Sequence, residues 1–302
     1  MVQQGMLDYK LLEALGCVIQ EQGFDKAAKK MCITQSAVSQ RIKALEEQTG
    51  QILVTRTAPP RATAHGQRLL KHYLQVSALE SDLARQRKGA DQGFTTLALG
   101  INADSLATWF FPAVEAFLTR KKVMLDLRVD DQDQTHKMLR NGEVSACISS
   151  EKKPVQGCRA TFLGTMNYRL AAAPDYARDH NLFDKTSGRL DPHRLAAAPA
   201  VIFNRKDDLH QLFFRACFDL PLPRIPVHYV PSSEGFARTI RSGLACGMIP
   251  DFQGLPLIQS GELMDLAPHC HIRVDLYWHC WHIGSDLLEE FSREIVKKAV
   301  IC

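Results

Sequence analysis

Hydrophobic residues recur at helical spacing from the start of the chain, and they predict two short helices there. The first helix is expected over residues 8–20, where five apolar residues share one face. These residues are Leu11, Leu12, Leu15, Val18 and Ile19. Gly23 should end this helix, and a second helix follows with Asp25 as its N-cap. Ala27 and Ala28 give the second helix a small face, which would let two helices cross closely.

A third helix is predicted to begin near Ser36, and its polar face is typical of a helix that reads DNA. At about 100° per residue, Val38, Ile42 and Leu45 form one stripe, which must face the core. The other side carries hydroxyl, amide and cationic groups, which can bond to base edges or phosphates. The candidate DNA-contacting residues here are Thr34, Gln35, Ser36, Ser39, Gln40, Arg41 and Lys43.

The same polar face also fits an ordinary amphipathic surface helix. Glu46 and Glu47 in its last turn would repel phosphate, so DNA contact is expected only in the first two or three turns. The short preceding helix and the turn of three to four residues favour the DNA-binding interpretation.

Residues 50–64 predict a wing beside this helix. Gly50 should end the helix, and residues 51–56 favour a short strand. Residues 58–61, Ala-Pro-Pro-Arg, predict a stiff turn. Arg56 and Arg61 flank this turn, where their charges can meet phosphates.

A long helix is predicted over residues 65–87, with Thr63 as its N-cap. Its apolar stripe comprises Leu69, Leu70, Tyr73, Leu74, Val76, Leu79 and Leu83. No nearby segment of the chain would cover so wide a stripe, so a helix from a second subunit is the simplest partner. Packing on the same chain is the alternative.

The charge of the chain is concentrated at its N-terminal end. Residues 1–90 hold 13 Lys and Arg against 8 Asp and Glu, whereas the remaining 212 residues hold 24 against 25. Within residues 26–71, nine residues are basic and two are acidic. A basic module on a neutral remainder is typical of a nucleic-acid reader with an attached second domain, although a solvated basic face is equally compatible with charge alone.

Strand and helix signals alternate after a flexible join at residues 88–93. Strands are expected at residues 94–101, 123–129, 144–148, 168–173, 200–203, 227–230, 245–249 and 272–278. Helices are expected at residues 105–118, 135–140, 207–218 and 233–242. Such alternation is typical of open parallel α/β sheets, and crossovers near residues 165 and 267 would give two lobes with a cleft.

The sequence resembles the LysR family of transcriptional regulators over nearly its whole length. The resemblance rests on F-D-K-A-A-K-K-M-C-I-T-Q-S-A-V-S-Q-R-I-K-A-L-E-E-Q-T-G at residues 24–50 and on S-G-L-A-C-G-M-I-P at residues 242–250. R-T-A-P-P-R, N-A-D-S-L-A-T-W and L-Y-W-H are similar to the ArgP (LysG) subfamily, whose members respond to arginine and lysine. The resemblance implies a periplasmic-binding-protein-like domain, with residues 273–298 returning to the first lobe.

Ligands of such sheets sit beyond the carboxyl ends of the strands, often at helix N-termini. A basic amino acid, the effector that the resemblance implies, needs a site for its carboxylate and acids for its two cationic groups. Polar residues at these strand ends are the candidates: Asn102, Asp104, Ser105, Asp131, Asn204, Ser232 and Glu234. For Asp104, Ser105 and Ser232, simple helix capping is the alternative role.

Several other classes of site are not expected. The nine cysteines are scattered singly without a C-x-x-C pair, so no disulfide framework is predicted. The His and Cys groups at residues 269–271 and 279–282 flank a predicted strand and would lie about 25 Å apart, too far for one metal. Trp278 within that strand is expected in the core. Hydrolase, metalloprotease and nucleotide-binding motifs are missing, so no catalytic residue, metal or cofactor is predicted.

The sequence therefore predicts an α-helical winged helix-turn-helix domain plus a long linker helix, followed by a two-lobed α/β effector domain. The DNA-binding domain is expected at residues 1–64, the dimerising linker helix at 65–90 and the effector-binding domain at 91–302. Lobe 1 should comprise about 93–165 and 268–302, and lobe 2 about 166–267.

The predicted function is regulation of amino-acid export or metabolism genes in response to lysine or arginine. The expected partners are promoter DNA, the effector, further copies of the chain in a dimer or tetramer, and RNA polymerase. No stretch of about 18 apolar residues and no signal-peptide pattern occur, so the cytoplasm is the expected location. The alternatives are a LysR-type regulator with another effector and an architectural or replication-associated DNA-binding protein without one.

Overall fold

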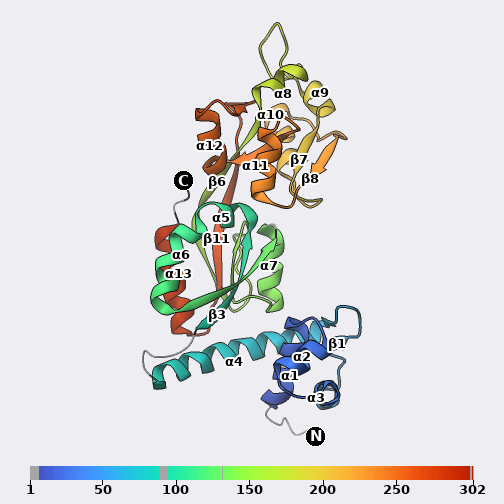
Figure 1. Ribbon diagram of the computed structural model, residues 1–302, viewed down its shortest axis with the longest axis vertical. Helices are drawn as coiled ribbons and strands as arrows, with labels where there is room; N and C mark the ends of the chain where they lie inside the picture. The colour runs from blue at the N-terminus through green and yellow to red at the C-terminus, as the bar shows by residue number, and fades with distance from the viewer. Residues whose placement is uncertain (1–6, 89–93, 131, 300, 302) are drawn as a thin grey trace.

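The computed structural model describes residues 7–88, 94–130, 132–299 and 301 (Figure 1). A small helical unit is joined by a long helix, α4, to a two-lobed α/β unit, and α4 lies beneath the first lobe. The N-terminal elements are α1 (Tyr9–Gln20), α2 (Phe24–Lys30), α3 (Gln35–Thr49), β1 (Val54–Thr55), β2 (Arg61–Ala62) and α4 (Ala64–Lys88). These elements form the winged helix-turn-helix and the linker helix that the sequence predicts.

Side-chain caps begin α1 and α3, at Asp8 and Thr34, whereas α2 begins without one. The Thr34 hydroxyl caps α3 by accepting a hydrogen bond from the backbone N–H of Ala37 at 3.1 Å. Val38, Ile42 and Leu45 are at most 4% exposed, so the predicted core stripe of α3 is confirmed. The prediction that Asp25 caps α2 is wrong, because the N-cap is Gly23 and Asp25 lies in the first turn.

The wing is attached to α3 through Glu46. Strands β1 and β2 are antiparallel, with Val54 opposite Ala62. The Glu46 carboxylate accepts hydrogen bonds from the backbone N–H groups of Leu53 at 2.8 Å and Val54 at 3.3 Å. Glu46 therefore holds the base of the wing against the helix, a role that its sequence position alone did not indicate.

Helix α4 divides its apolar stripe among three environments. Thr63 caps the helix as predicted, accepting from the backbone N–H of Gly66 at 3.1 Å. Leu69 and Tyr73 pack on the helical unit, and Leu74 packs on the core of the α/β unit. Leu83, farther along, is 55% exposed. The same chain thus covers the first half of the stripe, and the second half remains open to a partner.

In the described residues, nine helices and strands of the α/β unit form the first lobe and the crossings, and nine more form the second lobe. The first group is β3 (Thr95–Asn102), α5 (Ala103–Ala107), α6 (Phe110–Lys121), β4 (Val123–Asp130), α7 (Gln132–Asn141), β5 (Ala146–Ser149), β6 (Cys158–Ala172), β11 (Ile272–Trp281) and α13 (Asp286–Lys298). The second is α8 (Pro174–Asp179), α9 (Pro192–Ala197), β7 (Ala200–Ile202), α10 (Leu209–Phe218), β8 (Val227–Tyr229), α11 (Ser233–Arg241), β9 (Cys246–Pro250), α12 (Asp251–Gln259) and β10 (Met264–Asp265).

One mixed sheet runs through both lobes, in the order β4-β3-β5-β11-β6-β9-β7-β8, with β10 beside β6. The outer strands pair in parallel, but β6 pairs antiparallel with β11, β9 and β10. The two-lobed α/β arrangement is confirmed, whereas the expectation of purely parallel sheets is wrong. The reason is that the two crossover segments are themselves long strands that belong to the sheet.

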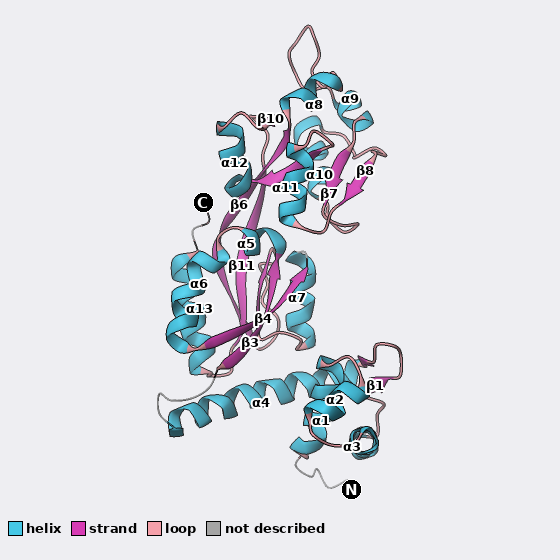
Figure 2. Cartoon of the chain, viewed as in Figure 1, coloured by secondary structure: helices cyan, strands magenta, loops and turns pink. Residues whose placement is uncertain are grey.

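Helices cover the sheet of the first lobe on both faces, with α6 and α13 on one side and α7 on the other (Figure 2). The single helix expected at residues 105–118 is divided into α5 and α6, because Thr108 departs from helical geometry with φ −118° and ψ −82°. Trp278 is 2% exposed and contacts Phe291, so its predicted place in the core is confirmed. Among the described residues, no helix combines the length and apolar character needed to cross a bilayer.

Two cysteines form a disulfide, contrary to the expectation from the sequence. Cys217, at the end of α10, is bonded to Cys270, just before β11, and their Cα atoms are 5.9 Å apart. The fold brings together two positions separated by 53 residues, which no local spacing signal could reveal. The other described cysteines are free: Cys17, Cys32, Cys147, Cys158, Cys246 and Cys280.

Replacing Gly66 with alanine should destabilise the helical unit. A Cβ at this position would lie 2.1 Å from the carbonyl oxygen of Leu53, a backbone atom that cannot rotate away. We expect the free energy of unfolding to fall by about 1–3 kcal/mol, measured by urea denaturation. Gly23→Ala is the control, because no atom lies within 4 Å of its added Cβ. Equal stability of Gly66→Ala and the unchanged protein would contradict this account.

Candidate functional site

A groove of about 520 Å³ brings predicted DNA-contacting residues from separate elements together. Gln35 and Ser39 of α3 line one side, Arg56 and residues 57–60 of the wing line another, and residues 22–25 complete it. Helix and wing therefore form one concave surface, which fits the rounded, charged backbone of a nucleic acid.

The remaining candidates on this unit lie around the groove. Ser36, Gln40 and Lys43 are exposed on α3, and Arg61 is exposed on β2, while Arg41 is half-buried. The Lys43 ammonium lies 3.6 Å from the Glu47 carboxylate, so this acid reduces the charge of the last turns. The hydroxyl of Thr34 is exposed but already serves as the cap of α3.

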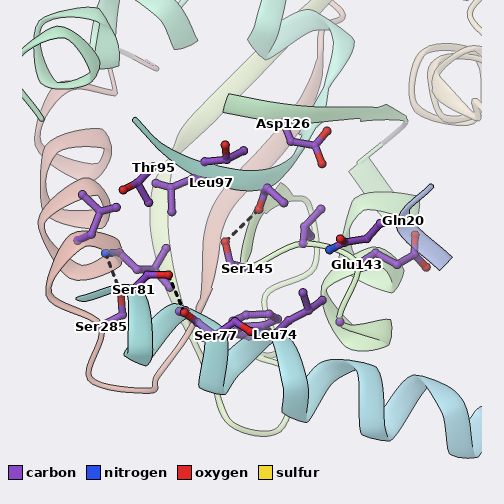
Figure 3. Close-up of a pocket in the computed structure, with 18 of the residues that line it drawn as sticks. Gln20, Leu74, Ser77, Ser81, Thr95, Leu97, Asp126, Glu143, Ser145 and Ser285 are labelled. Carbon is purple, nitrogen blue, oxygen red and sulfur yellow. Dashed lines mark hydrogen bonds between the residues drawn. The ribbon is translucent and has the colours of Figure 1, made fainter. Parts of the chain in front are cut away.

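A cavity of about 400 Å³ separates α4 from the base of the first lobe (Figure 3). Leu74, Ser77 and Ser81 line it from α4, and Leu97 and Ser145 line it from the lobe.

Direct contact between α4 and the lobe is made beside this cavity. The Lys71 ammonium lies 3.5 Å from the carbonyl oxygen of Gln156. A Cβ on Gly142 would lie 2.6 Å from the Cβ of Lys71, and Gly142 has a φ of 78°. Glycine at this position therefore permits both the turn after α7 and the close approach of α4.

The second candidate site is the cleft between the lobes, at the carboxyl ends of β3 and β4 and the loop after β7. It is lined by Asn102, Ala103, Asp104, Asp130, Tyr168, Phe203, Lys206, Asp207, Asp208 and Leu209. Four carboxylates thus face the cleft with a single lysine, which favours a cationic ligand. The space of about 60 Å³ is smaller than a typical ligand pocket of roughly 300 Å³ or more, so an amino acid needs more room than this arrangement of the cleft offers.

Asp104, Tyr168 and Ser233 form a hydrogen-bonded clasp across this cleft. Asp104, in α5 of the first lobe, accepts at 2.8 Å from the hydroxyl of Ser233, the first residue of α11 in the second lobe. Its other carboxylate oxygen accepts at 2.8 Å from the hydroxyl of Tyr168 in the crossing strand β6. The clasp therefore joins both lobes and one of the strands between them.

Burial dominates the electrostatics of the clasp. It raises the pKa of the Asp104 carboxyl above its ordinary value, and the hydrogen bonds from Ser233 and Tyr168 oppose this rise. Burial, together with the neighbouring Asp104, raises the pKa of Tyr168 well above its ordinary value. The Tyr168 hydroxyl thus keeps its proton and remains a donor.

Two buried polar atoms without partners lie at the end of β3 and in α5, and of their residues Asn102 lines the cleft whereas Ser105 does not. Asn102 is 4% exposed and Ser105 is fully buried. In the described structure, neither the Asn102 Oδ1 nor the Ser105 Oγ has a hydrogen-bond partner. Because unpaired buried polar groups are costly, these two atoms are suited to bind a ligand or water.

The other residues that the sequence predicted to bind the effector do not line the cleft in the described structure. Asn204 accepts from the backbone N–H of Lys206 at 2.7 Å and shapes the loop rather than lining the cleft. Ser232 caps α11, accepting from the backbone N–H of Gly235 at 3.2 Å. Glu234 lines a separate groove between α11 and α12. Asp131 lies outside the described residues.

Sequence reasoning missed Ser233, Tyr168, Lys206 and Asp207 in or beside the cleft. Ser233 adjoins the residue chosen as the cap, so the sequence offered a signal one position away. Tyr168 was predicted only as part of a strand, and Asp207 as the start of a helix. Their approach to the cleft depends on the crossing of β6 and on the turn after β7, which sequence spacing does not reveal.

Two family models match this chain, one in its N-terminal part and one in the remainder. A model described as the bacterial regulatory helix-turn-helix protein, lysR family, matches residues 9–67. A model described as the LysR substrate binding domain matches residues 90–298.

Several known regulators are similar to this chain over nearly its whole length. The HTH-type transcriptional regulator ArgP of Cronobacter sakazakii is 44% identical over 291 residues, which cover 96% of each chain. The crystal structure of ArgP from Mycobacterium tuberculosis is 36% identical, with a TM-score of 0.84 and 98% of each chain covered. LysG from Corynebacterium glutamicum with bound effector Arg is 34% identical, with a TM-score of 0.75, and the match covers 97% of this chain and 98% of LysG.

Buried His210, beside the cleft residue Leu209, should make the protein less stable at acidic pH. In the described structure neither ring nitrogen has a partner, and burial lowers the pKa of His210 to about 4 while Asp207 opposes the shift. At pH 7.5, about one pH unit above the ordinary pKa of histidine, the ring is almost entirely neutral in both the folded and the unfolded state. As the pH falls toward 4, the unfolded chain gains a proton that the folded chain excludes, so stability falls.

The variant His210→Leu should therefore lose about 2 kcal/mol less free energy of unfolding than the unchanged protein between pH 7.5 and pH 5. Urea denaturation at the two pH values measures this difference. His193→Leu serves as the control, because His193 is exposed. An identical pH dependence in His210→Leu and the unchanged protein would be incompatible with a buried neutral His210.

Proposed function

This chain belongs to the LysR family of bacterial helix-turn-helix regulators, and we propose that it controls genes of amino-acid export or metabolism in response to arginine or lysine. The observation that carries the proposal is the pairing of an exposed reading helix and wing with an acid-lined cleft in one chain. We further propose that it acts in the cytoplasm, where promoter DNA and the amino acids are both present.

The proposed DNA contact uses two kinds of residue. Ser36, Ser39 and Gln40 on α3 would reach base edges, because hydroxyl and amide groups distinguish bases in the major groove. Arg56 and Arg61 on the wing would bind phosphates, which position the protein without reading sequence. Glu46 supports this arrangement by holding the wing against α3.

The proposed assembly is a dimer or tetramer built through α4. The second half of the α4 stripe includes Val76 and Leu79, which are half-buried, and the exposed Leu83. A second copy of α4 would cover these residues and place two reading helices on half-sites one helical turn apart, or a multiple of it. RNA polymerase would bind beside the DNA-bound regulator at promoters that the regulator activates.

The proposed effector follows from the charges of the cleft. Asp104, Asp130, Asp207 and Asp208 of the cleft can neutralise the two cationic groups of arginine or lysine. We assign the carboxylate to the hydroxyl of Ser105, which adjoins Asp104 in sequence and is buried without a partner in the described structure. LysG, which resembles this chain over its length, was solved with bound arginine, and this supports the same class of effector here. Binding would move the lobes and thereby change the spacing of the reading helices.

Replacing Gln40 with alanine should lower affinity for the specific operator by about 1–3 kcal/mol, because one base-edge contact is lost. Affinity for unrelated DNA and the binding of arginine should remain unchanged. Fluorescence anisotropy with the chain's own upstream region and with a scrambled duplex measures both affinities.

Arg56→Ala gives the contrasting result in the same assay. This substitution should weaken binding to both duplexes by a similar factor and reduce the dependence of the affinity on salt concentration. Unchanged operator affinity in Gln40→Ala would refute the assignment of the reading face. Equal affinity of the unchanged protein for both duplexes would favour an architectural DNA-binding protein instead.

Arginine should bind the full-length protein at least about tenfold more tightly than citrulline, which has the same shape but lacks the side-chain charge. The acids of the cleft lose a charge-assisted hydrogen bond in the citrulline complex, typically about 1.5–3 kcal/mol. Isothermal titration calorimetry with arginine, lysine and citrulline tests this order. Equal affinities for arginine and citrulline, or no heat from arginine and lysine, would exclude the proposed effector class.

A further inference from the structure

The disulfide between Cys217 and Cys270 joins two segments of the second lobe that have different roles. Cys217 lies in the last turn of α10, and Cys270 lies two residues before β11 begins. Both residues are half-buried at the edge of the hydrophobic core, so a small solute can reach them from the surface.

Both segments lead to the cleft. The first residue of α10, Leu209, lines the cleft directly. On the other side, Ile272, the first residue of β11, stands opposite Tyr168 in the register of β6. Tyr168 in turn donates to Asp104 of the clasp. The bond therefore ties the far end of one cleft-forming helix to the start of a crossing strand.

Further contacts hold the Cys270 segment to β6. The Arg169 guanidinium donates to the Asp265 carboxylate at 3.0 Å and lies 2.9 Å from the Nε2 of His271, the residue after Cys270. Cys270 itself donates its backbone N–H to the carbonyl oxygen of Ala267 at 2.9 Å. The sulfur bond gives α10 a covalent link to this segment, in addition to the core packing of Phe213 and Phe214.

We propose that Cys217 and Cys270 form a reversible oxidation site that reacts with a hydroperoxide and thereby changes effector binding. Disulfides do not persist in a reducing cytoplasm, the location proposed above, so a pair at bonding distance there serves as a redox site rather than a permanent link. A hydroperoxide is small enough to reach a half-buried pair and is a two-electron oxidant. The other described cysteines lack a bonded partner, and burial raises the pKa of both Cys158 and Cys246 to about 11.

The reaction balances with hydrogen peroxide as the oxidant. One thiol loses its proton, and the thiolate attacks a peroxide oxygen and breaks the O–O bond. The leaving hydroxide takes up that proton, so a sulfenic acid and one water are formed. The second thiol attacks this sulfur, the S–S bond forms and a second water leaves. The two thiols lose two electrons, which the peroxide takes up. A small dithiol restores both thiols by exchange and is itself oxidised to a disulfide.

The oxidised bond should stiffen the second lobe and hold α10, whose first residue Leu209 lines the cleft, in one position. We expect the oxidised full-length protein to bind arginine about fivefold or more weakly than the reduced protein. Its Tm should rise by roughly 5 °C or more, since the bond closes a 53-residue loop. Reduction with dithiothreitol should reverse both changes.

The experiment treats reduced full-length protein with hydrogen peroxide and follows it by peptide mass spectrometry, thermal unfolding and calorimetry with arginine. The expected product is a cross-linked pair of peptides containing Cys217 and Cys270, with the loss of two hydrogens. Cys217→Ser should not form the cross-link. After peroxide treatment, its Tm and its affinity for arginine should remain those of the reduced protein. Cys158→Ser is the matched control and should respond like the unchanged protein.

Three results would overturn this proposal: no 217–270 cross-link after peroxide, a bond that dithiothreitol cannot reduce in the folded protein, or a reversible bond with equal Tm and arginine affinity in both forms. The arginine measurement rests on the proposed effector. If arginine binds neither form, the effector assignment fails, and the cross-link and Tm alone then decide whether the oxidation site exists.

Discussion

The antiparallel pairing of β6 with β11 is the interaction on which both lobes depend. The register runs from Tyr168 opposite Ile272 to Cys158 opposite Trp281, with one irregularity between Leu276 and Tyr277. β5 joins β11 on the first-lobe side, and β9 joins β6 on the second-lobe side. Each lobe therefore completes its sheet with strands that it shares with the other. Movement of the lobes must bend or twist this shared ladder of hydrogen bonds rather than rotate two separate bodies.

Local periodicity sufficed to predict the N-terminal unit, because its elements are stabilised by neighbours in sequence. The stripe of Val38 and Ile42 repeats at helical spacing. Thr63 caps α4 by accepting from a backbone N–H only three residues along the chain. The first half of β6 was missed because polar residues and Gly164, with a φ of 146°, interrupt its apolar pattern. Its direction could not be inferred either, because antiparallel pairing depends on a strand more than a hundred residues away.

The candidate cleft was only partly predictable for the same reason. Asn102 and Asp104 follow a predicted strand, and the rule for ligands of α/β sheets nominates such positions. Ser233 enters the site only because the second lobe folds back over Asp104, and the capping rule favoured its neighbour Ser232. The cleft and the reading helix are connected through the first lobe and α4, so a change at the clasp has a continuous physical route to the DNA-binding surface.

The close approach of Lys71 to Gly142 gives α4 a point on the first lobe about which it can pivot. Lys71 lies seven residues from the start of α4, or about 10 Å along the helix axis, and the cavity beyond it leaves room between helix and lobe. A tilt of about 20° around this point would displace the start of α4 by about 3 Å, close to the 3.4 Å rise of one base pair. A small rotation of the lobe at this contact would therefore move the winged unit by a distance of this size. If the cleft binds the effector that we propose, α4 is the lever arm through which its binding would reach the DNA-binding surface.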